Sequence, residues 1–192
     1  MKILQYIFAL LSCFFFYTSM SQPNSSLKKK AEKIIAVLKD SGEYAMGAKD
    51  TLIDLNGDRY LDLLIEYYGG SGTGLKNRIT VFLYDSSKKQ FRDCGQLNYL
   101  GNPTFYFKKK EVAGYYIALG GDSATQLKWN GLKLDTLEYI EVEVLGNSAD
   151  FFFRLTSRDY KTKKKTIQRM KTLKLPPMYK YWKYTPIIKR EN

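Results

Sequence analysis

The spacing of hydrophobic residues divides the chain near residue 50. Between residues 25 and 41, apolar side chains recur at intervals of three and four positions, which predicts one amphipathic helix. These apolar positions are Leu27, Ala31, Ile34, Ile35 and Leu38. Ser25 or Ser26 is the expected N-cap, because a short hydroxyl side chain can accept a hydrogen bond from the first turn. Gly42 is the expected stop, since glycine readily adopts the left-handed conformation that ends helices.

From Thr51 onward, short runs rich in Tyr, Phe, Val, Ile and Leu alternate with clusters of Gly, Asn, Asp and Ser. This alternation is typical of antiparallel β-structure. We expect strands near residues 50–54, 62–68, 78–84, 104–108, 113–119, 124–129, 132–145 and 150–156. Asn130-Gly131 lies between two apolar runs and predicts a tight hairpin. The predicted fold class is mainly β, with antiparallel sheets, as a meander or two packed sheets, and an N-terminal α-helix.

The first residues indicate export. A basic start, Met1-Lys2, precedes a long uncharged apolar run, and Ser19-Met20-Ser21 offers the small-x-small pattern that a signal peptidase reads. We therefore expect a signal peptide over residues 1–21 and a mature, single β-rich domain over 22–192. The mature domain would be periplasmic or extracellular, with no transmembrane span. Two alternatives stay open: a retained membrane anchor, and a lipoprotein joined to lipid through Cys13.

Composition excludes several kinds of chemistry. The chain has no His, which rules out Ser-His-Asp and Cys-His nucleophile systems and His-containing zinc sites. Once Cys13 has left with the signal peptide, Cys94 is a single thiol and no internal disulfide is expected. The formal net charge is +12.

Residues 159–192 form a strongly basic C-terminal segment, which could be helix or strand over 159–173. An exported basic protein is expected to meet a protein or an anionic envelope polymer, not nucleic acid. A merely solvated charged face is the alternative.

Residues 54–62, "DLNGDRYLD", concentrate oxygen-bearing side chains at alternate positions. Calcium prefers six to eight oxygen ligands, and a short loop supplies them when side chains at positions 1, 3 and 5 point inward. The ligand set predicted on that spacing is Asp54, Asn56 and Asp58 through their side chains, Tyr60 through its carbonyl, and Asp62 as a later carboxylate. Gly57 would let the chain bend between ligands. The alternative is a hydrogen-bonded Asx turn with no ion.

The residues around this loop resemble a known calcium motif. An EF-hand requires Gly at position 6 and Glu at position 12, where this chain has Arg59 and Ile65. "DLNGDRYLDLLIEY" instead resembles the calcium loop of the integrin-type FG-GAP or VCBS repeats, in which an acidic loop is followed by an apolar strand. That resemblance implies the same ligand positions as the spacing does. Arg59 departs from the family, which usually has Gly there.

A wider resemblance runs over about residues 50 to 140. The loop, a Gly-rich turn, "VFLYDSSKKQF" and the hairpin "KWNGLKL" follow one another, in an order similar to that of small exported bacterial proteins that carry one such loop. Some proteins of that kind are periplasmic inhibitors or immunity proteins directed against peptidoglycan hydrolases. The resemblance implies an exported calcium-binding interaction module, and an inhibitor of a cell-wall hydrolase is its most specific form.

Two features of the chain resemble those of enzymes. "GGSGTGLKN" departs from a Walker loop, because Leu75 precedes Lys76 and Asn77 replaces the hydroxyl residue, so no nucleotide is expected. We expect no catalytic activity. The rival hypothesis is an envelope hydrolase that uses paired carboxylates, and the third is a structural envelope protein without a specific partner. The available carboxylates are Glu66, Asp122, Glu138, Glu141 and Glu143.

Overall fold

The computed structural model describes residues 25–68, 77–98, 100–118, 121–146, 151–171 and 188–189. The expected signal peptide with Cys13, the Gly-rich residues 69–76 and the aromatic residues of the C-terminal tail lie outside these ranges. Among the described helices, none is both long and apolar enough to cross a membrane.

The predicted N-terminal helix is confirmed. Helix α2 spans Ser25–Asp40 and is followed by Gly42, whose φ of 77° is the left-handed conformation expected at a helix stop. Ala31 is buried, and Ile34, Ile35 and Leu38 pack beside it against Leu63 and Ile65 of the first sheet. The three- and four-residue spacing therefore marks the face that α2 presents to the sheet.

The first sheet has four antiparallel strands in the order β1-β2-β3-β4. They are β1 (Lys49–Ile53), β2 (Asp62–Tyr68), β3 (Asn77–Asp85) and β4 (Gln90–Asp93). Side chains alternate across this sheet, as strand geometry requires. Leu63 and Ile65 face α2, while Leu64, Val81 and Leu83 belong to the core on the other side.

The second sheet has seven strands in the order β10-β9-β8-β7-β6-β5-β11. It is an antiparallel meander except for β11, which pairs in parallel with β5. Its strands are β5 (Thr104–Tyr106), β6 (Glu111–Ala118), β7 (Gly121–Asn130), β8 (Lys133–Gly146), β9 (Phe151–Asp159), β10 (Lys164–Met170) and β11 (Ile188–Lys189), and the 3-10 helix η1 (Phe107–Lys109) follows β5.

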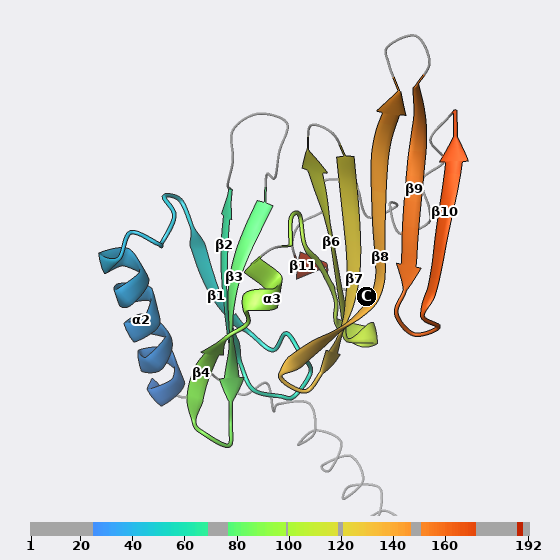
Figure 1. Cartoon of the computed structure of the whole chain (residues 1–192). Coiled ribbons are helices and arrows are strands. Elements are labelled where there is room, and N and C mark those ends of the chain that lie inside the picture. Colours follow the sequence, from blue (N-terminus) through green and yellow to red (C-terminus); the bar gives the residue numbers. More distant parts are fainter. Residues whose placement is uncertain are drawn as a thin grey trace, which may run out of the picture.

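One hydrophobic core joins the two sheets, with α2 outside the first (Figure 1). This core contains Val81 and Leu83 from β3, Leu97 from the short helix α3 (Gly95–Asn98), and Leu127 and Trp129 from β7. The layers are therefore a helix, a four-stranded sheet and a seven-stranded sheet. The predicted fold class is confirmed: the fold is mainly β, with two antiparallel sheets and an N-terminal helix.

Some local predictions differ from the structure. Strand β4 and helix α3 were not predicted, and residues 164–170 form a strand where the sequence left helix and strand open. The hairpin turn is shifted by one residue, because Asn130 pairs with Lys133 and the two loop positions are Gly131 and Leu132. Gly131 has φ 61°, which fits the glycine that a II′ hairpin turn requires at its first loop position. Cys94 is buried and free.

Candidate metal-binding loop

The acidic loop connects two antiparallel strands that are neighbours in the first sheet. Ile53 at the end of β1 pairs with Asp62 at the start of β2. Residues 54–61 therefore form a closed connection whose two ends are held together by the sheet, and the conformation of the loop is set by its internal hydrogen bonds.

The carboxylate of Asp54 organises the first half of the loop. Its Oδ1 accepts hydrogen bonds from the backbone N–H groups of Gly57, at 2.7 Å, and Asp58, at 3.2 Å. Its Oδ2 accepts from the N–H of Arg59 at 2.9 Å. The backbone thus wraps around the first predicted ligand, and three successive N–H groups stabilise its negative charge.

Left-handed residues make this wrapping possible. Gly57 has φ 75° and Arg59 has φ 74°. Arg59 occupies position 6 of the loop, where the resembling family usually has Gly. A non-glycine residue in this conformation costs about 1 kcal/mol, because its Cβ crowds the carbonyl oxygen that follows. The backbone is therefore left-handed at the position where the resembling family usually has Gly, although this chain has Arg59 there.

Asn56 connects the loop to the second sheet. It is 4% exposed. Its Oδ1 accepts from the N–H of Asp58 at 3.1 Å, and its Nδ2 donates to Asp58 Oδ2 at 3.0 Å. The same Nδ2 lies 3.4 Å from the carbonyl oxygen of Gly131, in the β7–β8 hairpin turn. The third predicted ligand, Asp58, accepts a further bond from the N–H of Tyr60 at 2.9 Å.

Asp62 lies behind the loop and is fully buried, with 0% exposure. Its Oδ2 accepts from the N–H of Leu55 and its Oδ1 from the N–H of Tyr84, both at 2.9 Å. One side chain thus joins the loop, the start of β2 and strand β3. Its pKa is raised to about 7, chiefly by burial; the two backbone N–H donors lower the pKa, and the negative charges of Asp58 and Asp54 add to the rise.

Tyr84 and Lys110 flank the loop. The ring of Tyr60 packs on that of Tyr84 with 5.9 Å between ring centroids, so the chain leaving the loop lies against β3. The Nζ of Lys110 is 3.3 Å from the carbonyl oxygen of Gly57, so a cationic side chain lies beside the acidic loop. The local sequence of the loop does not predict its contacts with Lys110, Gly131 and Tyr84, because all three residues are distant from it in the chain.

The predicted ligand atoms of the loop are of the type that calcium binds. All five predicted ligand atoms are oxygens, which hard divalent cations prefer, and three of the donors are carboxylates. Their present arrangement is dominated by hydrogen bonds to the loop's own N–H groups. Within the described ranges, no group of three or more His, Cys, Asp or Glu side chains is arranged so that it could hold a metal ion. The structure thus brings the predicted residues together on one loop, and their role as ligands stays a prediction.

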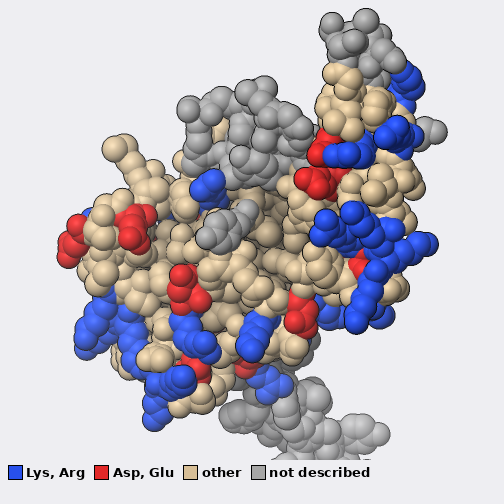
Figure 2. Space-filling view, in the orientation of Figure 1, with Lys and Arg blue, Asp and Glu red and all other residues tan. Residues whose placement is uncertain are grey.

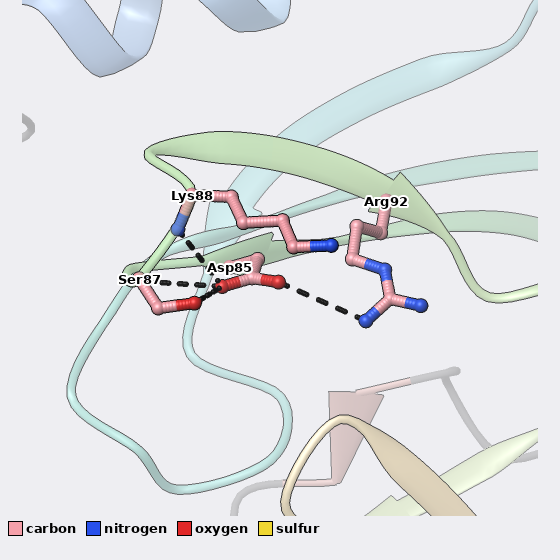
Figure 3. A network of polar contacts seen from close by, with 4 residues as sticks. All are labelled: Asp85, Ser87, Lys88 and Arg92. Carbon is pink, nitrogen blue, oxygen red and sulfur yellow. Dashed lines mark hydrogen bonds and ion pairs between the residues drawn. The ribbon is translucent and has the colours of Figure 1, made fainter.

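A second acidic turn, in which the Asp has a cationic partner, offers a comparison with the loop (Figure 3). Asp85, the last residue of β3, accepts from the Ser87 hydroxyl at 2.6 Å and from the N–H groups of Ser87 and Lys88. Its other oxygen lies 3.7 Å from Arg92 Nη1. The Ser87 hydroxyl holds the pKa of Asp85 below its usual range. Asp85 has a cationic partner, whereas Asp54, Asp58 and Asp62 accumulate negative charge around one loop.

The carboxylates of the rival hydrolase hypothesis lie on two different sheets. Glu66 lies on β2 of the first sheet, and burial raises its pKa. Glu141 and Glu143 share one face of β8 in the second sheet, and Glu143 forms an ion pair with Arg154. Glu138 accepts a hydrogen bond from the Ser157 hydroxyl at 3.1 Å. The side chain of the fifth candidate, Asp122, lies outside the described part of the structure.

Comparisons with known proteins give little guidance. No protein-family model matches the chain, and no curated protein matches it. A solved structure described as "Structure of a Xanthomonas Type IV Secretion System related protein" resembles it with a TM-score of 0.41 and 12% sequence identity. The similarity covers 63% of this chain and 57% of that one, so this chain spans little more than half of the other protein's length. A likeness this slight carries no argument about function.

Proposed function

We propose that the protein is an exported calcium-binding interaction module, and that its loop over residues 54–62 holds the ion. The ligands would be the side chains of Asp54, Asn56, Asp58 and Asp62 and the carbonyl of Tyr60. The observation that carries the proposal is the left-handed backbone of Arg59. The loop is left-handed at the position where the resembling family usually has Gly, so its backbone is compatible with the motif although its residue departs from it.

The ion's task in this proposal is to stabilise the fold. Three carboxylates interact unfavourably here, since Asp54 and Asp58 both raise the pKa of the buried Asp62. A divalent cation would neutralise that charge and tie the loop to β2 and β3. Because such an ion binds the folded state, it adds to the free energy of unfolding by mass action, by about 2.7 kcal/mol at a hundredfold excess over Kd.

Calorimetric unfolding in calcium and in a chelator tests the ion. We expect a higher Tm in calcium for the wild type and no such difference for Asp58→Ala. Asp40→Ala, which changes an exposed carboxylate at the end of α2, is the matched control and should keep the calcium response. Comparing the two conditions within each variant cancels any direct effect of the substitution on stability. A wild-type Tm that is equal in calcium and in chelator would refute calcium binding.

The interaction partner in this proposal is another macromolecule of the envelope, and a cell-wall hydrolase that the protein inhibits is the most specific candidate. The support is the exported, basic sequence and its resemblance to inhibitor and immunity proteins. A peptidoglycan turnover assay with a purified muramidase tests this idea: slower digestion supports inhibition. Degradation of peptidoglycan by the protein alone would favour the rival hydrolase hypothesis, and loss of that activity in Glu141→Gln would identify its carboxylate.

A further inference from the structure

The final hairpin of the second sheet carries opposed positive charges on one face. In the β9–β10 register, Arg154 lies directly opposite Arg169, and Arg158 directly opposite Lys165. Directly opposed residues of an antiparallel pair point to the same face, so these four cations form one group. Figure 2 shows Lys and Arg side chains gathered over this part of the molecule. Like charges placed directly opposite each other destabilise a hairpin, so this arrangement needs an explanation other than folding.

Internal partners account for only part of this charge. Arg154 forms an ion pair with Glu143, and the Arg169 guanidinium lies 5.0 Å from the centroid of the Phe152 ring. Arg158 and Lys165 form no ion pair with an acidic residue of the described ranges. The group therefore retains excess positive charge on its outer side.

An exposed apolar residue lies in the middle of the group. Ile167 is 57% exposed and stands on β10 midway between Lys165 and Arg169. Strand β10 is also an edge of the sheet, since among the described strands it pairs only with β9. An edge strand presents unpaired backbone N–H and C=O groups to which an extended chain can add. The edge thus offers main-chain hydrogen bonds, an apolar contact and two flanking cations.

The charges on β10 determine which kind of extended chain can pair with its edge. A second copy of β10 paired antiparallel around Ile167 would place Lys165 against Arg169, and this repulsion disfavours self-association. An acidic strand would instead place carboxylates against both cations. A phosphate polymer would satisfy the cations, but it has no apolar group for Ile167 and no main chain for the strand edge.

We propose that the β10 edge docks an extended acidic segment of a partner protein. Alternate residues of the added strand share a face with Lys165, Ile167 and Arg169, so the segment should read acidic-x-apolar-x-acidic. This inference rests on the proposed function, because it specifies the partner of the interaction module. It is independent of the calcium loop, which lies at the β1–β2 connection of the other sheet.

A fluorescent peptide that repeats Glu-Thr-Val-Thr is the probe, and anisotropy at about 0.15 M salt measures its binding. Lys165→Glu/Arg169→Glu should weaken binding about tenfold or more, because two attractive contacts become repulsive and 1.4 kcal/mol corresponds to tenfold. The control Lys161→Glu/Lys164→Glu makes the same change in net charge in the turn and on the other face of β10, and should bind within about twofold of the wild type. Circular dichroism checks that both variants fold.

Two further arms identify the occupant. A peptide N-methylated at alternate backbone amides should lose binding, because it cannot pair with the strand edge. Equal binding of the methylated peptide, or an equal effect of both charge variants, would overturn the proposal. Polyphosphate that binds more tightly than the peptide, and that is weakened by Lys165→Glu/Arg169→Glu but not by Lys161→Glu/Lys164→Glu, would overturn the proposal in favour of an envelope polymer. All arms run in chelator as well as in calcium, so failure of the calcium proposal and failure of this one give different results.

Discussion

Replacing Asp62 by Asn tests the electrostatics of the acidic loop most directly. Asp62 is fully buried, and its two oxygens accept hydrogen bonds from Leu55 and Tyr84. Burial, with the charges of Asp58 and Asp54, raises its pKa from 3.8 to about 7. Asn has the same shape, cannot ionise, and offers one accepting oxygen in place of two.

The sign and size of the effect follow from that pKa. Because the folded-state pKa lies above the unfolded value, the folded protein holds an extra proton between the two, and stability falls as pH rises through this window. At 1.36 kcal/mol per pKa unit, wild-type protein should lose roughly 2–3 kcal/mol of unfolding free energy between about pH 5 and about pH 8 from this group. Asp62→Asn lacks this loss, but it leaves one backbone N–H without its acceptor, at a cost of about 1–3 kcal/mol. The variant should therefore be clearly less stable than the wild type at the lower pH, and the two should converge at the higher pH.

Urea unfolding followed by circular dichroism, in chelator at both pH values, measures the effect. The difference between wild type and Asp62→Asn isolates this carboxyl from Glu66, whose pKa is also raised by burial. Asp40→Asn, at an exposed position at the end of α2, is the control and should follow the wild type. Parallel pH profiles for wild type and Asp62→Asn would refute the account of Asp62. Calcium should flatten the wild-type profile, because a cation beside a carboxylate lowers its pKa.

Two substitutions test other features of the fold and the loop. Gly114→Ala should lower the free energy of unfolding by about 1–3 kcal/mol through overpacking, because an added Cβ would lie 2.5 Å from Leu100 Cγ. Urea unfolding measures this loss. Gly95→Ala is the control, because its added Cβ would meet nothing closer than 4.0 Å. Arg59→Gly should raise the Tm in calcium above that of the wild type, since φ 74° no longer strains a side chain. An unchanged calcium response with a lower Tm would contradict that reasoning.

Several elements could be predicted from local sequence because their signal is periodic. Helix α2 shows its buried face through Ala31 and the apolar residues that follow it at three- and four-residue spacing. Most strands are recognisable as apolar, β-branched runs between turn residues, and Gly131 marks a hairpin even though the turn itself is shifted by one position. Strand β4 and helix α3 were missed, because four residues are too few for a periodic pattern to develop.

The sequence by itself determined the content of the acidic loop: which oxygens it carries, their spacing, and the departure at Arg59. Tertiary structure decided how those oxygens are used. Asp62 faces the core because β2 lies between β1 and β3, which brings the N–H of Tyr84 to its carboxylate. The opposed cations of β9 and β10 likewise exist only in the register of the folded hairpin. Contacts of this kind join residues that lie apart in the chain, and the local sequence around one residue does not indicate its partner.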